Sequence, residues 1–82
     1  MIRDNVKRIR KAKGVMATHI SKALGYKTPQ GYHYLENGQA NISAEKLKAI
    51  AGVLGEDVSI FFDDKLTEIV LQRIRGAEIV RD

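Results

Sequence analysis

Residues 16–38, MATHISKALGYKTPQGYHYLENG, predict two short helices joined by a tight turn. The first helix is expected over residues 17–24, because apolar side chains recur there at the i, i+3, i+4 spacing of one helical face. These side chains are Ile20, Ala23 and Leu24. Gly25 follows as a left-handed C-terminal stop, since glycine adopts positive φ without steric cost.

The second helix of this stretch is expected from Pro29 to about Asn37. Thr28 offers a side-chain oxygen for an N-cap, and proline supplies the fixed φ that suits the first helical position. Asn37-Gly38 ends the helix. Tyr32 and Leu35 then face inward, whereas the outward face carries uncharged polar and aromatic groups, Gln30, His33, Tyr34 and Asn37. Such a face can hydrogen-bond base edges without a large desolvation cost.

Several spaced motifs make the chain resemble the Cro/repressor-type (Xre-like) helix-turn-helix family. The resemblance covers roughly residues 5 to 62 and is carried by Arg10, Gly14, Ile20, Leu24-Gly25, Leu35-Glu36-Asn37-Gly38, Ser43, Leu47, Val58-Ser59 and Phe62. It implies an all-α, compact five-helix domain like that of the lambda repressor. It also implies similarity to small phage repressors and to restriction-modification controller proteins, and hence a bacterial or phage origin.

The family resemblance also implies an ion pair between Arg10 and Glu36. A planar guanidinium fits a partly buried carboxylate as a fork, so both residues are assigned a structural role. The alternative, a catalytic carboxylate at Glu36, is less favoured.

Gln30 is the leading candidate for a base contact, because its amide can pair bidentately with adenine. Tyr34 could contact a thymine methyl or a phosphate, and His33 a base or a phosphate. The other candidates for contacts to DNA are Lys22, Lys27, Thr28, Pro29, Asn37, Gln39 and Asn41. The alternative for each is a solvated side chain on an outward face.

Two departures from the family pattern predict weaker phosphate anchoring. Ala17 stands where the family carries a glutamine that commonly helps to hold a phosphate. The loop 39–42 is neutral where the family often has lysine or arginine, so it would depend on backbone amides and on the side chains of Gln39 and Asn41.

The flanking segments predict three further helices and a short helical turn. The first is expected from Asp4 or Asn5, one of which caps it, to Lys13, with Gly14 as its stop, and the next from the Ser43 cap to about Leu54, with Gly55 as its stop. Ser59 is expected to cap a short turn in which Phe62, with Ile60 or Phe61, seals the core. The last helix is expected over residues 65–75, with Asp63 and Asp64 at its positive N-terminal end.

An apolar stripe on the last helix predicts a homodimer interface. It comprises Leu66, Ile69, Val70 and Ile74, is extended by Ala77 and broadened by Leu71, and adjoins the Phe61/Phe62 region, which is expected to be exposed. A small domain already has its own core, so this stripe suggests a partner surface. The alternative is a fifth helix that folds back on its own core. The chain is thus divided into a DNA-binding domain, residues 1–64, and a dimerisation helix and tail, residues 65–82.

The charge of the 82 residues is polarised along the chain. Residues 1–35 carry +7 and residues 36–82 carry −3, which together give the formal net charge of +4. A basic lobe attracts polyanions, and binding to phosphates releases counterions. With no cysteine, no signal peptide and no apolar run long enough to span a bilayer, the chain is expected to be cytoplasmic.

These features favour a sequence-specific transcriptional regulator, a repressor that binds an inverted repeat as a homodimer. The alternative is a protein-interaction module, such as an antitoxin, that uses the same fold for a protein partner. An enzyme is disfavoured, because two isolated histidines and no glycine-rich phosphate loop leave nothing to perform catalysis. No cofactor, metal, small-molecule ligand or membrane association is expected.

Overall fold

The computed structural model describes the backbone of residues 2–80 and the side chains of residues 2–76. Within these residues the chain forms five α-helices and one short 3-10 helix, and no strand, as the sequence predicts. In chain order they are α1 (Ile2–Lys13), α2 (Ala17–Ala23), α3 (Gln30–Asn37), α4 (Ala44–Leu54), η1 (Val58–Phe62) and α5 (Asp64–Val80).

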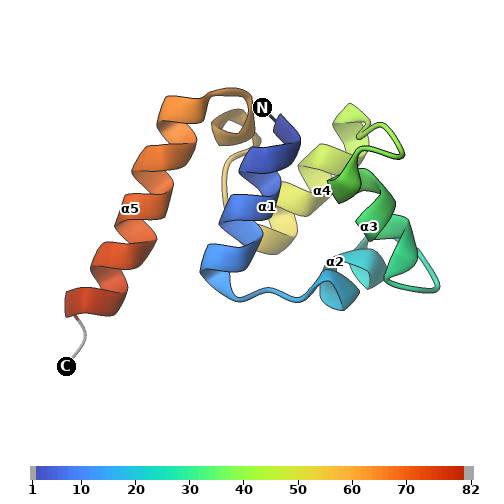
Figure 1. Ribbon diagram of the computed structural model, residues 1–82, viewed down its shortest axis with the longest axis horizontal. Helices are drawn as coiled ribbons and strands as arrows, with labels where there is room; N and C mark the ends of the chain where they lie inside the picture. The colour runs from blue at the N-terminus through green and yellow to red at the C-terminus, as the bar shows by residue number, and fades with distance from the viewer. Residues whose placement is uncertain (1, 81–82) are drawn as a thin grey trace.

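Helix α1 is the central element, with α5 on one side and the helix-turn-helix pair α2–α3 on the other (Figure 1). It contacts α3, α4, η1 and α5. All of these elements contribute apolar side chains to one core, made of Val6, Ile9, Ile20, Tyr32, Leu35, Leu47, Ile50, Ala51, Leu54, Ile60, Phe61, Val70 and Leu71. The core therefore continues across the boundary predicted at residue 64.

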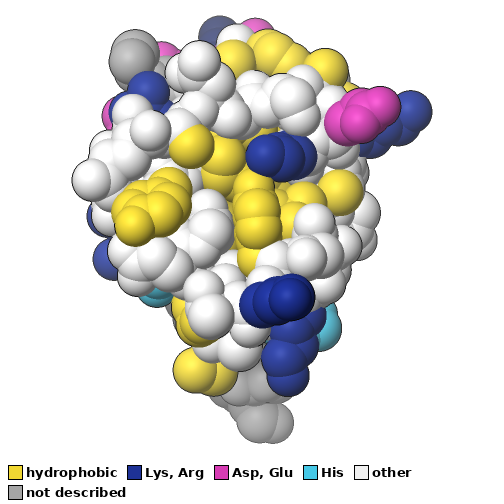
Figure 2. Space-filling model, turned by 90° about the vertical axis from the view of Figure 1, so that its right-hand side faces the viewer, with side chains coloured by type: hydrophobic (Ala, Val, Ile, Leu, Met, Phe, Trp, Pro, Cys, Tyr) yellow, Lys and Arg dark blue, Asp and Glu magenta, His cyan; other side chains and the backbone are white. Residues whose placement is uncertain are grey.

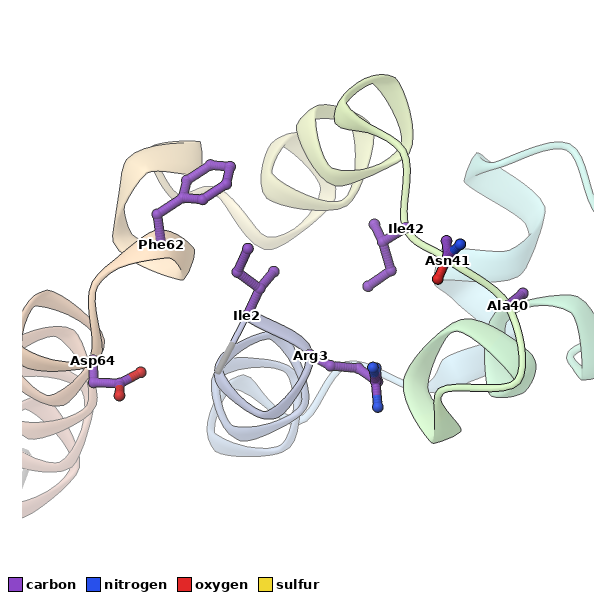
Figure 3. A pocket seen from close by; sticks show the side chains of 7 residues that line it. All are labelled: Ile2, Arg3, Ala40, Asn41, Ile42, Phe62 and Asp64. Carbon is purple, nitrogen blue, oxygen red and sulfur yellow. The ribbon is translucent and has the colours of Figure 1, made fainter.

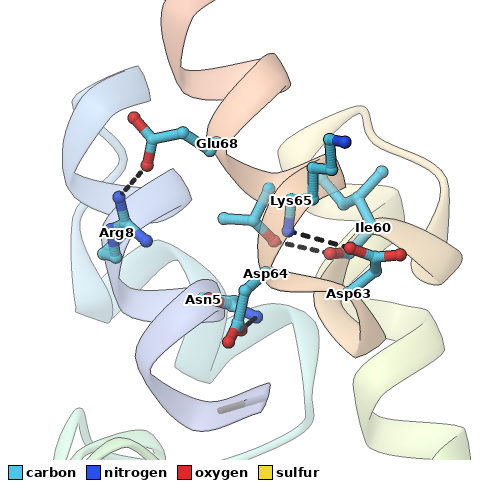
Figure 4. A network of polar contacts seen from close by, with 8 residues as sticks. Asn5, Arg8, Ile60, Asp63, Asp64, Lys65 and Glu68 are labelled. Carbon is cyan, nitrogen blue, oxygen red and sulfur yellow. Dashed lines mark hydrogen bonds and ion pairs between the residues drawn. The ribbon is translucent and has the colours of Figure 1, made fainter.

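The predicted N-terminal cap of the first helix is wrong. Helix α1 begins at Ile2, so Asp4 and Asn5 lie inside it. Asn5 is only 2% exposed, and its Nδ2 donates to the Phe61 carbonyl oxygen at 3.0 Å and to Asp64 Oδ1 at 2.9 Å (Figure 4). A buried amide must find partners, and here they lie in η1 and α5 rather than in the first turn of its own helix.

The segment around η1 corrects two further predictions. Asp57, not Ser59, caps the turn: its Oδ1 accepts the Ser59 N–H at 2.9 Å. Phe61 is fully buried, whereas Phe62, which was expected to seal the core, is 62% exposed. Successive residues of a 3-10 helix point about 120° apart. Ile60 and Phe61 take the two directions that face the core, so Phe62 points outward.

Helix α5 begins at Asp64, capped by Asp63, whose Oδ1 accepts the N–H groups of Lys65 at 2.8 Å and Leu66 at 3.1 Å (Figure 4). It runs on to Val80 instead of ending near residue 75, so Gly76 lies inside the helix. The expectations for the Ala77 side chain and for residues 81–82 lie outside the described residues.

Helix α5 is held against the core by one face. Val70 and Leu71 are buried there, and Thr67 Oγ1 donates to the Ile60 carbonyl oxygen. The interpretation of α5 as a helix folded back on its own core is therefore correct for this face. The opposite face remains open to solvent.

Candidate nucleic-acid interface

Helix α3 is the element that carries the predicted base contacts. Pro29 occupies its N-cap position with φ of −63°, and no side chain caps the helix, so the predicted Thr28 cap is wrong. At its other end Gly38 adopts φ of +84°, and the Gln39 N–H donates to the Tyr34 carbonyl oxygen at 2.9 Å. This left-handed glycine ends the helix as predicted.

The two faces of α3 are divided as predicted. Tyr32 and Leu35 are buried in the core. Gln30, Tyr34 and Asn37 are exposed, and His33 is half-buried on the same side. On the face of the molecule in Figure 2, Lys and Arg side chains lie above and below an apolar centre, and the Asp and Glu side chains lie at the margin. The exposed stripe of α3 can therefore approach a polyanion.

The turn before α3 packs closely against it. A Cβ atom built on Gly31 would lie 2.6 Å from Cγ of the Tyr26 ring, so only glycine leaves room for this contact. Lys46 Nζ, from the first turn of α4, lies 5.4 Å from the centre of the same ring. Tyr26 is thus held between α3 and α4, and it fixes the angle at which α3 leaves the turn.

Replacing Gly31 by Ala is expected to destabilise the protein by about 1 to 3 kcal/mol, because the added methyl group overlaps the base of the Tyr26 ring. Helix propensity alone would give the opposite sign, a gain of about 1 kcal/mol. Gly52→Ala in α4 is the matched control, since a Cβ there meets nothing within 4 Å. Urea unfolding of both variants checks the prediction: a stabilised Gly31→Ala protein would contradict it.

The predicted ion pair between Arg10 and Glu36 is present and bidentate. Arg10 Nε donates to Oε2 and Nη2 to Oε1, both at 2.9 Å, and Nη1 donates to the Val15 carbonyl oxygen at 3.0 Å. The side chains are 12% and 4% exposed. This pair joins α1 to the last turn of α3, so it fixes the orientation of the exposed stripe.

The environment of the pair favours its charged form. Burial, the largest single influence, raises the pKa of Glu36, but the hydrogen bonds and charge of Arg10, together with the nearby Tyr32 and Lys7, outweigh it, and the pKa of the carboxyl is lowered. Burial, reinforced by the nearby Glu36 carboxylate, raises the pKa of Tyr32. The Tyr32 hydroxyl itself is buried and makes no hydrogen bond within the described part of the chain.

Two basic residues of the predicted N-terminal lobe, Arg8 and Lys13, form ion pairs with glutamates of the same chain. Arg8 pairs with Glu68, and Lys13 and Arg73 both pair with Glu56. Among residues 2–76, no ion pair joins Lys22 or Lys27 to a carboxylate. These two lysines, at the end of α2 and in the turn before α3, therefore keep their charge available.

The loop after α3 offers fewer phosphate donors than expected. The Gln39 and Ala40 N–H groups both donate to the Tyr34 carbonyl oxygen, at 2.9 and 3.1 Å. They are consequently not free to bind a phosphate. The side chains of Gln39 and Asn41 are exposed. Arg3 also lies beside this loop, and the sequence does not indicate it, because no local pattern relates a residue in α1 to one beyond α3.

The predicted dimer interface is only partly exposed. Phe61 and Val70 are buried in the core of the same molecule, so they cannot contact a partner. Leu66 and Ile69 are 40% and 57% exposed, and Phe62 lies one turn before them. Leu66 and Ile69 are hereafter called the α5 apolar strip. Ile74 is half-buried against the core.

The part of the chain that the structure describes contains no group of three or more His, Cys, Asp or Glu side chains that could hold a metal ion. None of its helices is both long and apolar enough to cross a membrane.

Comparison with known proteins gives one match. A family model described as helix-turn-helix (HTH_3) matches residues 6–61, which extend from α1 into η1. No curated protein and no solved structure matches the chain.

Proposed function

The chain belongs to the Cro/C1-type (Xre-like) helix-turn-helix family of DNA-binding regulators, and on this premise we propose that it is a repressor that binds an inverted-repeat operator as a homodimer. The observation that carries the proposal is the uncharged, exposed stripe of α3, held in place by the buried Arg10–Glu36 pair. A rigid helix with such a stripe can enter the major groove and bond to base edges.

Gln30 is the proposed source of base specificity, because it is exposed in the first turn of α3. His33 and Tyr34 follow on the same face. Contacts to the DNA backbone are assigned to Lys22, Lys27, Thr28, Pro29, Asn37, Gln39 and Asn41. Phosphate contacts of this kind set register and much of the affinity, whereas base contacts set the sequence.

The α5 apolar strip is the proposed contact with a second copy of the chain. A two-fold dimer uses the same patch on both subunits, so one exposed strip is sufficient. Two α3 helices separated by about 34 Å would then meet successive major grooves on one side of an inverted repeat.

Selection of binding sites from a random duplex pool tests this proposal. We expect an inverted repeat to be enriched, and Gln30→Ala to lose about 1 to 3 kcal/mol of discrimination at one base pair of each half-site. Gln72→Ala is the matched control, since Gln72 is an exposed glutamine on α5. Enrichment without symmetry, or equal effects of the two substitutions, would argue against the proposed arrangement.

A protein-interaction module, such as an antitoxin, is the second candidate. The observation that favours it is the loop after α3, which has no charged side chain and has two N–H groups already bonded to Tyr34. DNA retention that does not change with salt concentration would support this alternative, because phosphate binding always releases counterions.

A further inference from the structure

Arg3, in the first turn of α1, lies over the C-terminal end of α3. A Cβ atom built on Gly38 would overlap the Arg3 guanidinium, so the two groups are in direct contact. Figure 3 shows the Arg3 side chain extending from α1 toward the loop that carries Ala40 and Asn41, and these three residues line one shallow pocket. Gly38 thus ends α3 and also provides the surface on which Arg3 rests.

The Arg3 guanidinium has no carboxylate partner among the described residues. Arg8, Arg10 and Arg73, by contrast, each pair with a glutamate. Asp64 lines the same pocket but projects on the far side of the end of α1 from Arg3 (Figure 3). Arg3 therefore keeps a full charge and a fork of N–H donors that suits a phosphate.

The loop beside Arg3 carries no charged side chain. Residues 37–43, NGQANIS, contain no acidic or basic side chain. The amides of Gln39 and Ala40 are occupied by the Tyr34 carbonyl oxygen. Arg3 therefore brings a cation to this neutral loop.

We infer that Arg3, with the exposed side chains of Gln39 and Asn41, forms a site for one DNA backbone phosphate at the C-terminal end of α3. Lys22 and Lys27 lie at the other end of the helix-turn-helix, so both ends of α3 carry a cation that can grip the backbone. The inference rests on the proposed DNA-binding function and adds a residue from α1 to its contact surface.

The salt dependence of DNA binding tests this site. We expect Arg3→Ala to reduce the magnitude of the slope of log Kobs against log salt by about 0.9 for each phosphate that the variant no longer neutralises. The corresponding decrease in affinity is roughly eightfold per phosphate at about 0.1 M salt. Both changes should occur equally on the selected operator and on a random-sequence duplex. Arg3→Lys should keep most of the slope, because it keeps the charge.

Lys11→Ala is the matched control. Lys11 is an exposed cation on the same helix, but it lines a pocket with Leu71 and Arg75 on the side of α5. This substitution removes the same charge and should leave the slope unchanged. Urea unfolding of both variants separates a phosphate contact from a role of Arg3 in stabilising the end of α3 by its charge.

The possible results are distinct. An unchanged slope in Arg3→Ala, with wild-type protein that binds in a salt-dependent way, overturns the phosphate site and leaves the proposed function intact. A lowered unfolding free energy with an unchanged slope also overturns it, since Arg3 then acts only on the fold. Wild-type protein that binds neither duplex overturns the proposed function and the site with it.

Discussion

Replacing Glu36 by Ala is expected to destabilise the protein by about 3 to 5 kcal/mol, because it leaves the Arg10 charge buried without a partner. Arg10 makes two bonds to this carboxylate, and its side chain is only 12% exposed. A domain of this size has about 5 to 15 kcal/mol of total stability, so the loss is a large part of it. We expect the melting temperature to fall by at least about 12 °C.

Glu68→Ala provides the comparison. It removes the ion pair with Arg8, in which both side chains are 44% exposed, and should cost at most about 1 kcal/mol. A double variant, Arg10→Met with Glu36→Leu, should recover most of the stability, since no buried charge remains. Equal losses in the Glu36 and Glu68 single variants would show that the buried pair does not stabilise α3.

The same pair should make stability sensitive to acid. Because the folded pKa of Glu36 is lowered from its ordinary value of 4.5, the carboxylate contributes its full stabilisation above that pH. The contribution is lost as the pH falls through the folded pKa. The difference in unfolding free energy between wild type and Glu36→Ala should therefore be constant near neutrality and should shrink below pH 4.5.

Replacing Ile69 by Glu is expected to convert the protein to a monomer and to weaken operator binding by about 100-fold or more. Ile69 is 57% exposed in the α5 apolar strip, so the substitution should leave the fold of the monomer intact. In a two-fold dimer the new carboxylate would lose its hydration and would lie close to the same carboxylate of the partner subunit. Linked half-sites gain about 10²- to 10⁴-fold in affinity from simultaneous binding, and a monomer loses this gain.

Sedimentation and operator titration of the same sample measure both effects. Arg75→Ala is the matched control, because it makes the same change in net charge at an exposed position on the side of α5 that faces Lys11. It should remain dimeric. A wild-type protein that sediments as a monomer at the concentrations of operator binding would remove the basis of the dimer proposal.

The sequence alone determined the helix-turn-helix and the helix ends that depend on local geometry. Gly25, Gly38 and Gly55 take positive φ values of 85°, 84° and 69°, where glycine stops were predicted. Ser43 Oγ accepts the Lys46 N–H as the cap of α4. Such signals depend on residues a few positions apart, so they can be recognised without the fold. The Arg10–Glu36 pair was predicted from the family resemblance.

Only the tertiary structure decided which side chains cap a helix, which are buried in the core and which contact a distant segment. Asn5 could have capped a helix, but its amide bonds to Phe61 and Asp64, more than 50 positions away. Phe61 is buried in the core, and Phe62 is exposed in its place. Arg3 comes to lie on Gly38 through the packing of α1 against α3. For Asn5 and Phe61 a contact between distant segments prevails over the local preference, because a buried polar or aromatic group gains more from the core than from its neighbours in sequence.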